Sequence, residues 1–134
     1  MNPIPVRLCP GNDLRRSLER LACAFPTGSG FVLSGIGSLA DASIRLADQS
    51  AETTITGPLE LLSVSGSLSQ GGAHLHVSVA DASGRVIGGH LGYGTLVRTT
   101  AEILLVSLDT WTLVREVDEI TGFKELVARP VVSS

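Results

Sequence analysis

The feature that most constrains the fold is a series of short extended segments between residues 30 and 108, separated by glycines and turn residues. Val, Ile, Leu, Ser and Thr dominate these segments, a composition that favours β-structure. In residues 73–80, polar side chains alternate with apolar ones, which is the period of a strand with one buried face. Strands are expected at residues 31–36, 42–47, 52–56, 59–68, 73–80, 85–87, 95–108 and 111–117.

In one segment that precedes these strands, the apolar residues recur at the spacing of a helix. Asn12 or Asp13 is placed to cap its first turn, and Pro26 ends it. One helix followed by many antiparallel-type strands predicts an α+β fold around an antiparallel sheet, in a single domain covering residues 1–134. The helix is expected within residues 8–25, with Leu14, Leu18, Leu21, Ala22 and Phe25 packed on the sheet.

Composition indicates a globular protein, and charge gives little support to DNA binding. Hydrophobic residues make up 43% of the chain and charged residues 17%, the reverse of a disordered protein. The net charge is −3, and the sequence lacks the basic stripe with which DNA-binding domains neutralise phosphates. Arg15, Arg16 and Arg20 lie beside Glu19 and fit the solvent-exposed side of the predicted helix. The surplus of aliphatic residues indicates that some apolar surface meets another subunit.

The N-terminal region and the cysteines bear on the cellular compartment. Residues 1–10 lack the charged start and apolar stretch of a secretory signal, and no apolar run approaches the ~18 residues of a membrane span. Cys9 and Cys23 follow neither a CxxC nor a metal-binding spacing, so reduced thiols are expected. We therefore expect a cytoplasmic protein without membrane contact.

The three histidines of the chain form the strongest candidate site. His74 and His76 are two residues apart in a predicted strand, so they share one face, with Cα atoms roughly 6.5–7 Å apart. Leu75 and Val77 take the opposite face, toward the core. His90 follows a predicted turn and is expected to return beside the pair. Three neutral imidazoles suit zinc, nickel, copper or iron and leave a coordination position open, although two strand histidines also fit an ordinary solvent-exposed face.

Several motifs occur in an order that resembles the PPC domain (the "plants and prokaryotes conserved" domain). They extend from Pro10 to about Leu108. The motifs are PGNDL before the helix, GIGSL followed by ASIRL, LELLSVSGSL, HLHVSVAD with its SGRV turn, GGHLGYGTLV and TTAEILL.

The resemblance carries expectations beyond those of the residues. It implies an α+β fold around an antiparallel sheet, a homotrimer, and a metal at the matching histidines of some bacterial relatives. No feature of the sequence selects the ion, and zinc is the one we expect first. Stand-alone bacterial members bear the label "predicted DNA-binding protein", taken from plant relatives whose Arg-Gly-Arg-Pro motifs enter the minor groove. This sequence has no such motif, so the label comes without the residues that contact DNA.

Two hypotheses of function follow, with a purely structural trimer as a third. The first is a non-enzymatic, trimeric PPC-domain protein, DNA-binding by family label only, with a metal site at His74, His76 and His90. The second is a metal-dependent, hydrolase-like enzyme that activates a water on this metal. Glu102 is then the candidate fourth ligand, a partner of a ligand, or the general base. Arg45 suits an anionic ligand or an ion pair with a strand glutamate.

Overall fold

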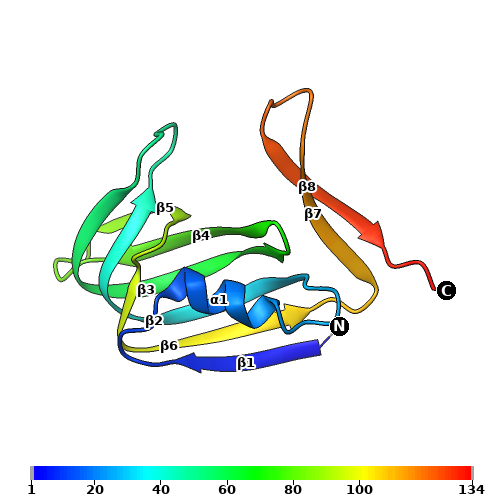
Figure 1. Cartoon of the computed structure of the whole chain (residues 1–134). Coiled ribbons are helices and arrows are strands. Elements are labelled where there is room, and N and C mark those ends of the chain that lie inside the picture. Colours follow the sequence, from blue (N-terminus) through cyan, green and yellow to red (C-terminus); the bar gives the residue numbers. More distant parts are fainter. Residues whose placement is uncertain (1, 134) are drawn as a thin grey trace.

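The computed structural model describes residues 2–133 and shows a mainly β protein with one short helix (Figure 1). The antiparallel sheet with one helix packed on it is as expected, and because that helix is short the fold is mostly antiparallel β and less helical than the expected α+β class. The elements are β1 (Asn2–Leu8), α1 (Leu14–Ala22), β2 (Gly30–Arg45), β3 (Thr53–Ser69), β4 (Gly72–Ala80), β5 (Val86–Leu91), β6 (Leu96–Ser107), β7 (Trp111–Val117) and β8 (Lys124–Pro130).

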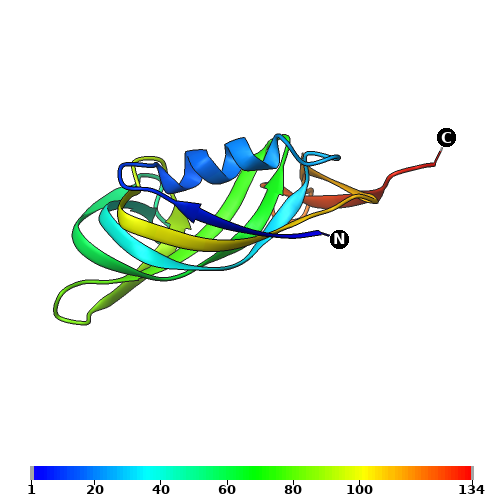
Figure 2. The ribbon, with the colours of Figure 1, turned by 90° about the horizontal axis from the view of Figure 1, so that it is seen from below.

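The main sheet has six antiparallel strands in the order β1-β6-β2-β3-β4-β5. The C-terminal part of β2 also pairs with β5, through Ile44 with Leu91 and Arg45 with His90. This second pairing brings β5 back against β2, so the sheet curls strongly. Figure 2 shows the curled sheet with α1 lying across one of its faces. Strands β7 and β8 form a separate hairpin that projects from the main sheet (Figure 1).

Helix α1 closes the core on that face. The side chain of Asp13 accepts a hydrogen bond from the backbone N–H of Arg16 and caps the first turn. Leu14 and Leu18 are fully buried against the sheet. The helix is shorter than expected from residues 8–25, because Leu8 belongs to β1, where its backbone pairs with β6.

Two of the expected strand breaks are absent. Gly35 and Gly37 lie inside the continuous strand β2, and Gly57 lies inside β3. A Cβ atom at Gly37 would lie 2.6 Å from the carbonyl oxygen of Thr100. This glycine therefore permits close contact between β2 and β6 and does not turn the chain. Strand β7 has the predicted bounds, whereas β1 and β8 were not predicted.

The β7–β8 hairpin is attached to the main sheet at two points. The backbone N–H of Leu113 donates to Ser29 Oγ at 2.9 Å, and the Leu113 side chain is buried. Further along β7, Arg115 Nη2 donates to Ser67 Oγ of β3 at 2.8 Å. These contacts hold the hairpin beside the outer face of β3.

Two further observations concern membrane spans and the cysteines. None of the helical segments in residues 2–133 has the length and apolar character needed to cross a membrane. Cys9 and Cys23 are both free thiols at the surface, as expected from their spacing.

Candidate metal centre

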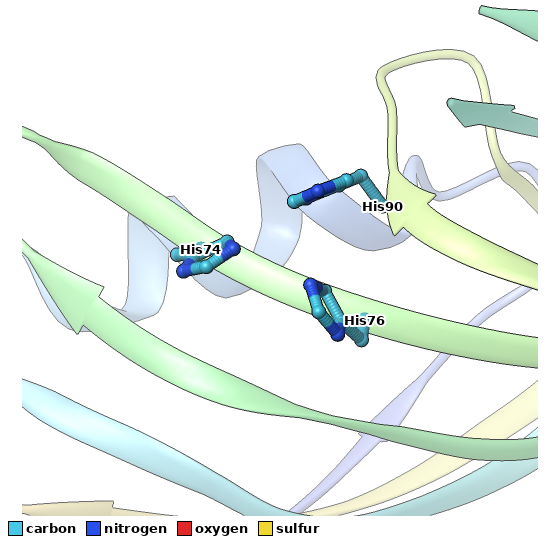
Figure 3. Close-up of side chains that lie close together, drawn as sticks. All are labelled: His74, His76 and His90. Carbon is cyan, nitrogen blue, oxygen red and sulfur yellow. The ribbon is translucent and has the colours of Figure 1, made fainter. Parts of the chain in front are cut away.

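Strand β4 presents His74 and His76 on the face turned away from the core. The residues between and after them, Leu75 and Val77, are 2% and 4% exposed, whereas His76 is exposed and His74 half-buried. The alternation of residues 73–80 therefore has the predicted orientation. Figure 3 shows the two imidazoles above β4 with the ring of His90 beside them.

Strand β5 brings His90 to the pair. The antiparallel register of β4 and β5 sets His90 directly opposite His76. The preceding turn is held by Asp81, whose carboxylate accepts hydrogen bonds from the backbone N–H groups of Ser83 and Arg85. The turn therefore sets the register that pairs the two histidines.

The glycine pair before His90 allows β5 to fit between its neighbours. A Cβ atom at Gly88 would lie 2.7 Å from the carbonyl oxygen of Val77 in β4. A Cβ atom at Gly89 would lie 2.5 Å from the carbonyl oxygen of Arg45 in β2. Side chains at these positions would push the strands apart, so the glycines permit the close pairing that places His90.

The three rings form a compact group. Ring centroids lie 5.0 Å apart for His74 and His76, 5.1 Å for His74 and His90, and 4.6 Å for His76 and His90. One ring nitrogen from each histidine lies within 4.8 Å of the others. A tetrahedral zinc ion with Zn–N distances of 2.0–2.1 Å needs nitrogens about 3.3 Å apart, so the ring nitrogens would have to move up to about 1.5 Å closer together on binding. The donor set fits a transition metal, with a position left open.

Burial and nearby positive charge favour the neutral form of two of these histidines. Burial lowers the pKa of His74, and the charges of Arg115 and His76 lower it further, against an opposing contribution from Glu125. The pKa of His90 is lowered by burial first and then by Arg45. Neutral imidazole is the form that binds metal, so the surroundings of His74 and His90 favour the metal-binding form at neutral pH.

A hollow of about 320 Å³ lies between β3, β4 and the β7–β8 hairpin, next to the histidines. Sequence reasoning did not assign the hairpin to the site, because nothing local in residues 111–130 indicates which strands it contacts. The residues that line the hollow are Phe31, Ser65, Gly66, Ser67, His74, His76, Arg115, Glu125 and Leu126.

Glu102, the candidate fourth ligand or general base, lies elsewhere. It is on β6, where its backbone lies opposite Arg7 of β1 on one side and Ile36 of β2 on the other. Strands β2 and β3 separate β6 from β4 in the sheet order. Its side chain lines a different hollow, together with Glu60 and Arg98. Within residues 2–133, the group of possible metal ligands around the histidines consists of His74, His76 and His90 alone.

Comparison with known proteins now places the chain. The family model described as the Plants and Prokaryotes Conserved (PCC) domain matches residues 1–109. The chain belongs to this family. The match includes all three histidines and ends before β7, so the hairpin that carries Arg115 lies outside it.

Solved structures share the fold of this PPC domain over nearly its whole length. A hypothetical protein from Salmonella cholerae-suis has a TM-score of 0.92 and 32% identity, covering 98% of this chain and 95% of that one. A metal-containing protein from Archaeoglobus fulgidus has a TM-score of 0.78 and 28% identity, covering 95% and 94%. A PPC protein from Pyrococcus horikoshii has a TM-score of 0.71 and 25% identity, covering 93% and 92%.

Curated relatives are much longer than this PPC domain. The bifunctional protein GlmU of Synechococcus sp. strain JA-2-3B'a(2-13) is 50% identical over 127 residues. The match covers 95% of this chain and 20% of that protein. GlmU of strain JA-3-3Ab gives 50% identity over 122 residues, again with 20% of its length. The chain thus spans about a fifth of the length of these relatives.

Proposed function

We propose that this PPC domain binds a divalent transition metal ion, zinc first, through His74, His76 and His90. The observation that carries the proposal is the convergence of three ring nitrogens within 4.8 Å of one another from two paired strands. The Archaeoglobus relative, which shares the fold at 28% identity, is itself described as containing metal.

The protein's part in this proposal is to hold three neutral imidazoles in one place. Each contributes one ring nitrogen, and the backbone pairing of His76 with His90 sets β5 beside the strand that carries His74 and His76. When bound, the ion supplies a Lewis-acid centre with a coordination position for water or another ligand. The carboxylate on which the hydrolase alternative relied, Glu102, lies in a separate hollow, so the proposal is metal binding without an assigned reaction.

The proposal also includes assembly as a homotrimer. Three large apolar side chains on the neighbouring strands β2 and β3 are about half exposed: Leu33 at 55%, Ile36 at 53% and Leu62 at 45%. Covering them in a subunit interface would remove apolar surface from water. This surface and the family resemblance together support self-association.

DNA binding has a weaker basis than metal binding in this chain. The net charge is −3, and four arginines are engaged by carboxylates. These pairs are Arg15 with Glu19, Arg16 with Asp13, Arg85 with Asp81, and Arg129 with Glu116. A carboxylate beside a guanidinium reduces its attraction to phosphates.

The test of the metal centre is elemental analysis of untagged protein after reconstitution with zinc and desalting. Wild-type protein is expected to retain about one ion per chain. His76→Ala should retain less than about a tenth of that, since loss of one of three ligands weakens the site strongly. Because His76 is exposed, the far-UV circular dichroism of the variant should not change.

Ser78→Ala is the matched control for this experiment. Ser78 lies on the same face of β4, two residues beyond His76, and its hydroxyl bonds Ser63 at 2.7 Å. This variant should retain as much zinc as wild type. Wild-type protein that holds no zinc after reconstitution would contradict the proposed function.

A further inference from the structure

The guanidinium of Arg115 lies beside the histidines and makes one hydrogen bond within the described chain. It lies half-buried on β7 and lines the same hollow as His74 and His76. One of its N–H groups donates to Ser67 Oγ at 2.8 Å, and Ser67 is 6% exposed. Within residues 2–133, no carboxylate lies within ion-pair distance of Arg115. A guanidinium has five N–H donors, so most of its hydrogen-bonding capacity faces the hollow or solvent.

Arg45 occupies a comparable position on the other side of His74. It is opposite His90 in the β2–β5 pairing and lines a second hollow with His74 and His90. Its guanidinium donates to the backbone carbonyl of Gln49 at 3.2 Å. Like Arg115, it forms no ion pair with any carboxylate of the described chain. The ion pair with a strand glutamate considered from sequence is thus not formed among the described residues.

The other charged groups near the histidines already have partners. Arg15 donates to the Glu19 carboxylate and to the carbonyl oxygen of Leu91. The Glu52 carboxylate accepts from Ser43 Oγ at 2.6 Å. Glu125, which lines the first hollow with Arg115, accepts from Thr121 Oγ1 at 3.1 Å.

A bound divalent ion would leave this region with excess positive charge. Three neutral imidazoles do not offset any of the ion's charge, and Arg45 and Arg115 each add one more. Glu52 and Glu125 neutralise only half of that total. In a partly buried site such an excess favours the entry of an anion.

We propose that this PPC domain binds a small carboxylate or phosphate compound at the histidine cluster, with one oxygen on the metal and another on Arg115. The inference rests on the proposed metal centre. A guanidinium N–H makes a strong, charge-assisted hydrogen bond to one oxygen of either group, and the position left open by three histidines takes a second oxygen. Arg45 adds attraction from the second hollow.

The lining of the first hollow indicates how the rest of the ligand is held. Its volume of about 320 Å³ is at the small end of ligand pockets. Phe31 and Leu126 give it apolar walls, and Ser65 adds a hydroxyl. Arg115 and Glu125 both come from the β7–β8 hairpin, beyond the residues that the family model matches. The hairpin thus supplies the guanidinium that the proposed anion contacts.

The test uses the full chain loaded with cobalt(II), whose visible absorption bands report its coordination, in chloride-free buffer. Acetate and inorganic phosphate are titrated separately as the two probes. At least one is expected to shift the cobalt bands saturably, and the more effective probe identifies the preferred oxyanion. Arg115→Gln should weaken that binding about tenfold, the loss of one charge-assisted pair, with cobalt affinity no lower than in wild type.

Two further variants complete the experiment. Arg129→Gln removes the same charge from an exposed arginine of the same hairpin, one that pairs with Glu116, and should change anion binding by less than about twofold. Arg45→Gln should weaken anion binding about threefold through the loss of a nearby charge. If circular dichroism shows that Arg115→Gln does not fold, the Arg45→Gln variant is used in its place to test the anion site.

The outcomes separate the two proposals. Absence of cobalt bands in wild type would overturn the metal centre and the anion site with it. Cobalt bands that respond to neither acetate nor phosphate would overturn the anion site alone. Equal anion affinity in wild type, Arg115→Gln and Arg45→Gln would show that the arginines do not bind the anion, and would also overturn it.

Discussion

His76 and His90 lie directly opposite each other on β4 and β5, with ring centroids 4.6 Å apart and ring planes at 83°. Their relative position is set by backbone hydrogen bonds between the two strands, and the contact between the rings is a consequence of that register. A backbone-determined pair of this kind exists before a metal ion arrives. The site is therefore sensitive to the fit of β5 against its neighbours.

This sensitivity predicts a strong effect of Gly89→Ala. The new Cβ would lie 2.5 Å from the carbonyl oxygen of Arg45, a backbone atom that moves only with β2. The free energy of unfolding should fall by about 1–3 kcal/mol, and zinc retention should fall with it because His90 is displaced. Chemical denaturation and elemental analysis measure the two effects. Gly71→Ala is the control, since a Cβ there meets nothing within 4 Å, and unaltered zinc retention in Gly89→Ala would contradict the prediction.

Metal binding should weaken as the pH falls below about 6.5. Protons and metal compete for the same imidazole nitrogens, and the pKa values of His74 and His90 lie below the ordinary histidine value. Zinc affinity should thus stay nearly constant from pH 8 to about pH 6.5 and then decline. Competition with a chromophoric chelator at several pH values measures it. An affinity that rises on acidification would contradict the role of neutral imidazoles.

The same pKa shifts predict how acid affects the metal-free protein. Below about pH 6.5 the histidines of the unfolded chain take up protons before His74 and His90 do in the folded chain. The unfolded state then binds more protons, so the free energy of unfolding should decrease as the pH falls through this range. Above it both states are neutral and these residues contribute no pH dependence. Urea denaturation with a chelator present, comparing wild type with His74→Gln, should show a smaller decrease in the variant.

Binding to duplex DNA should be weak and independent of sequence at physiological salt. The net charge is −3, and four of the ten basic residues pair with carboxylates, so the overall charge does not favour contact with phosphates. Fluorescence anisotropy with an AT-rich and a GC-rich duplex should give similar, high dissociation constants that rise with salt. Submicromolar, salt-resistant binding to one of them would contradict this expectation.

A homotrimer should have three times the chain mass of 13.9 kDa in light scattering at micromolar concentration. Leu62→Glu places a charge at a half-exposed position and should shift the mass toward that of one chain, without loss of circular dichroism, if β3 lies in the interface. Thr54→Glu, an exposed position on the same strand, serves as the control for added charge. Wild-type protein that scatters as a monomer would contradict the assembly.

Local patterns were enough to predict much of the sheet, and their failures have physical causes. Strand β7 and the faces of β4 were predicted because alternation and β-branched residues act over a few neighbours. Strand β1 was missed because Pro3 and Pro5 interrupt its pattern. As an edge strand beside β6, it tolerates residues that lack an N–H. Glycines at β2 were taken as breaks, although they serve the close approach of β6.

The shared face of His74 and His76, opposite Leu75 and Val77, follows from the amino-acid pattern, because a strand's period of two is a local property. That His90 joins them and Glu102 does not follows from the strand order, which depends on contacts far apart in the chain. The same holds for Arg115, which reaches Ser67 across 48 positions of sequence. Such placements depend on how whole strands and hairpins pack, and no pattern within a single segment records them.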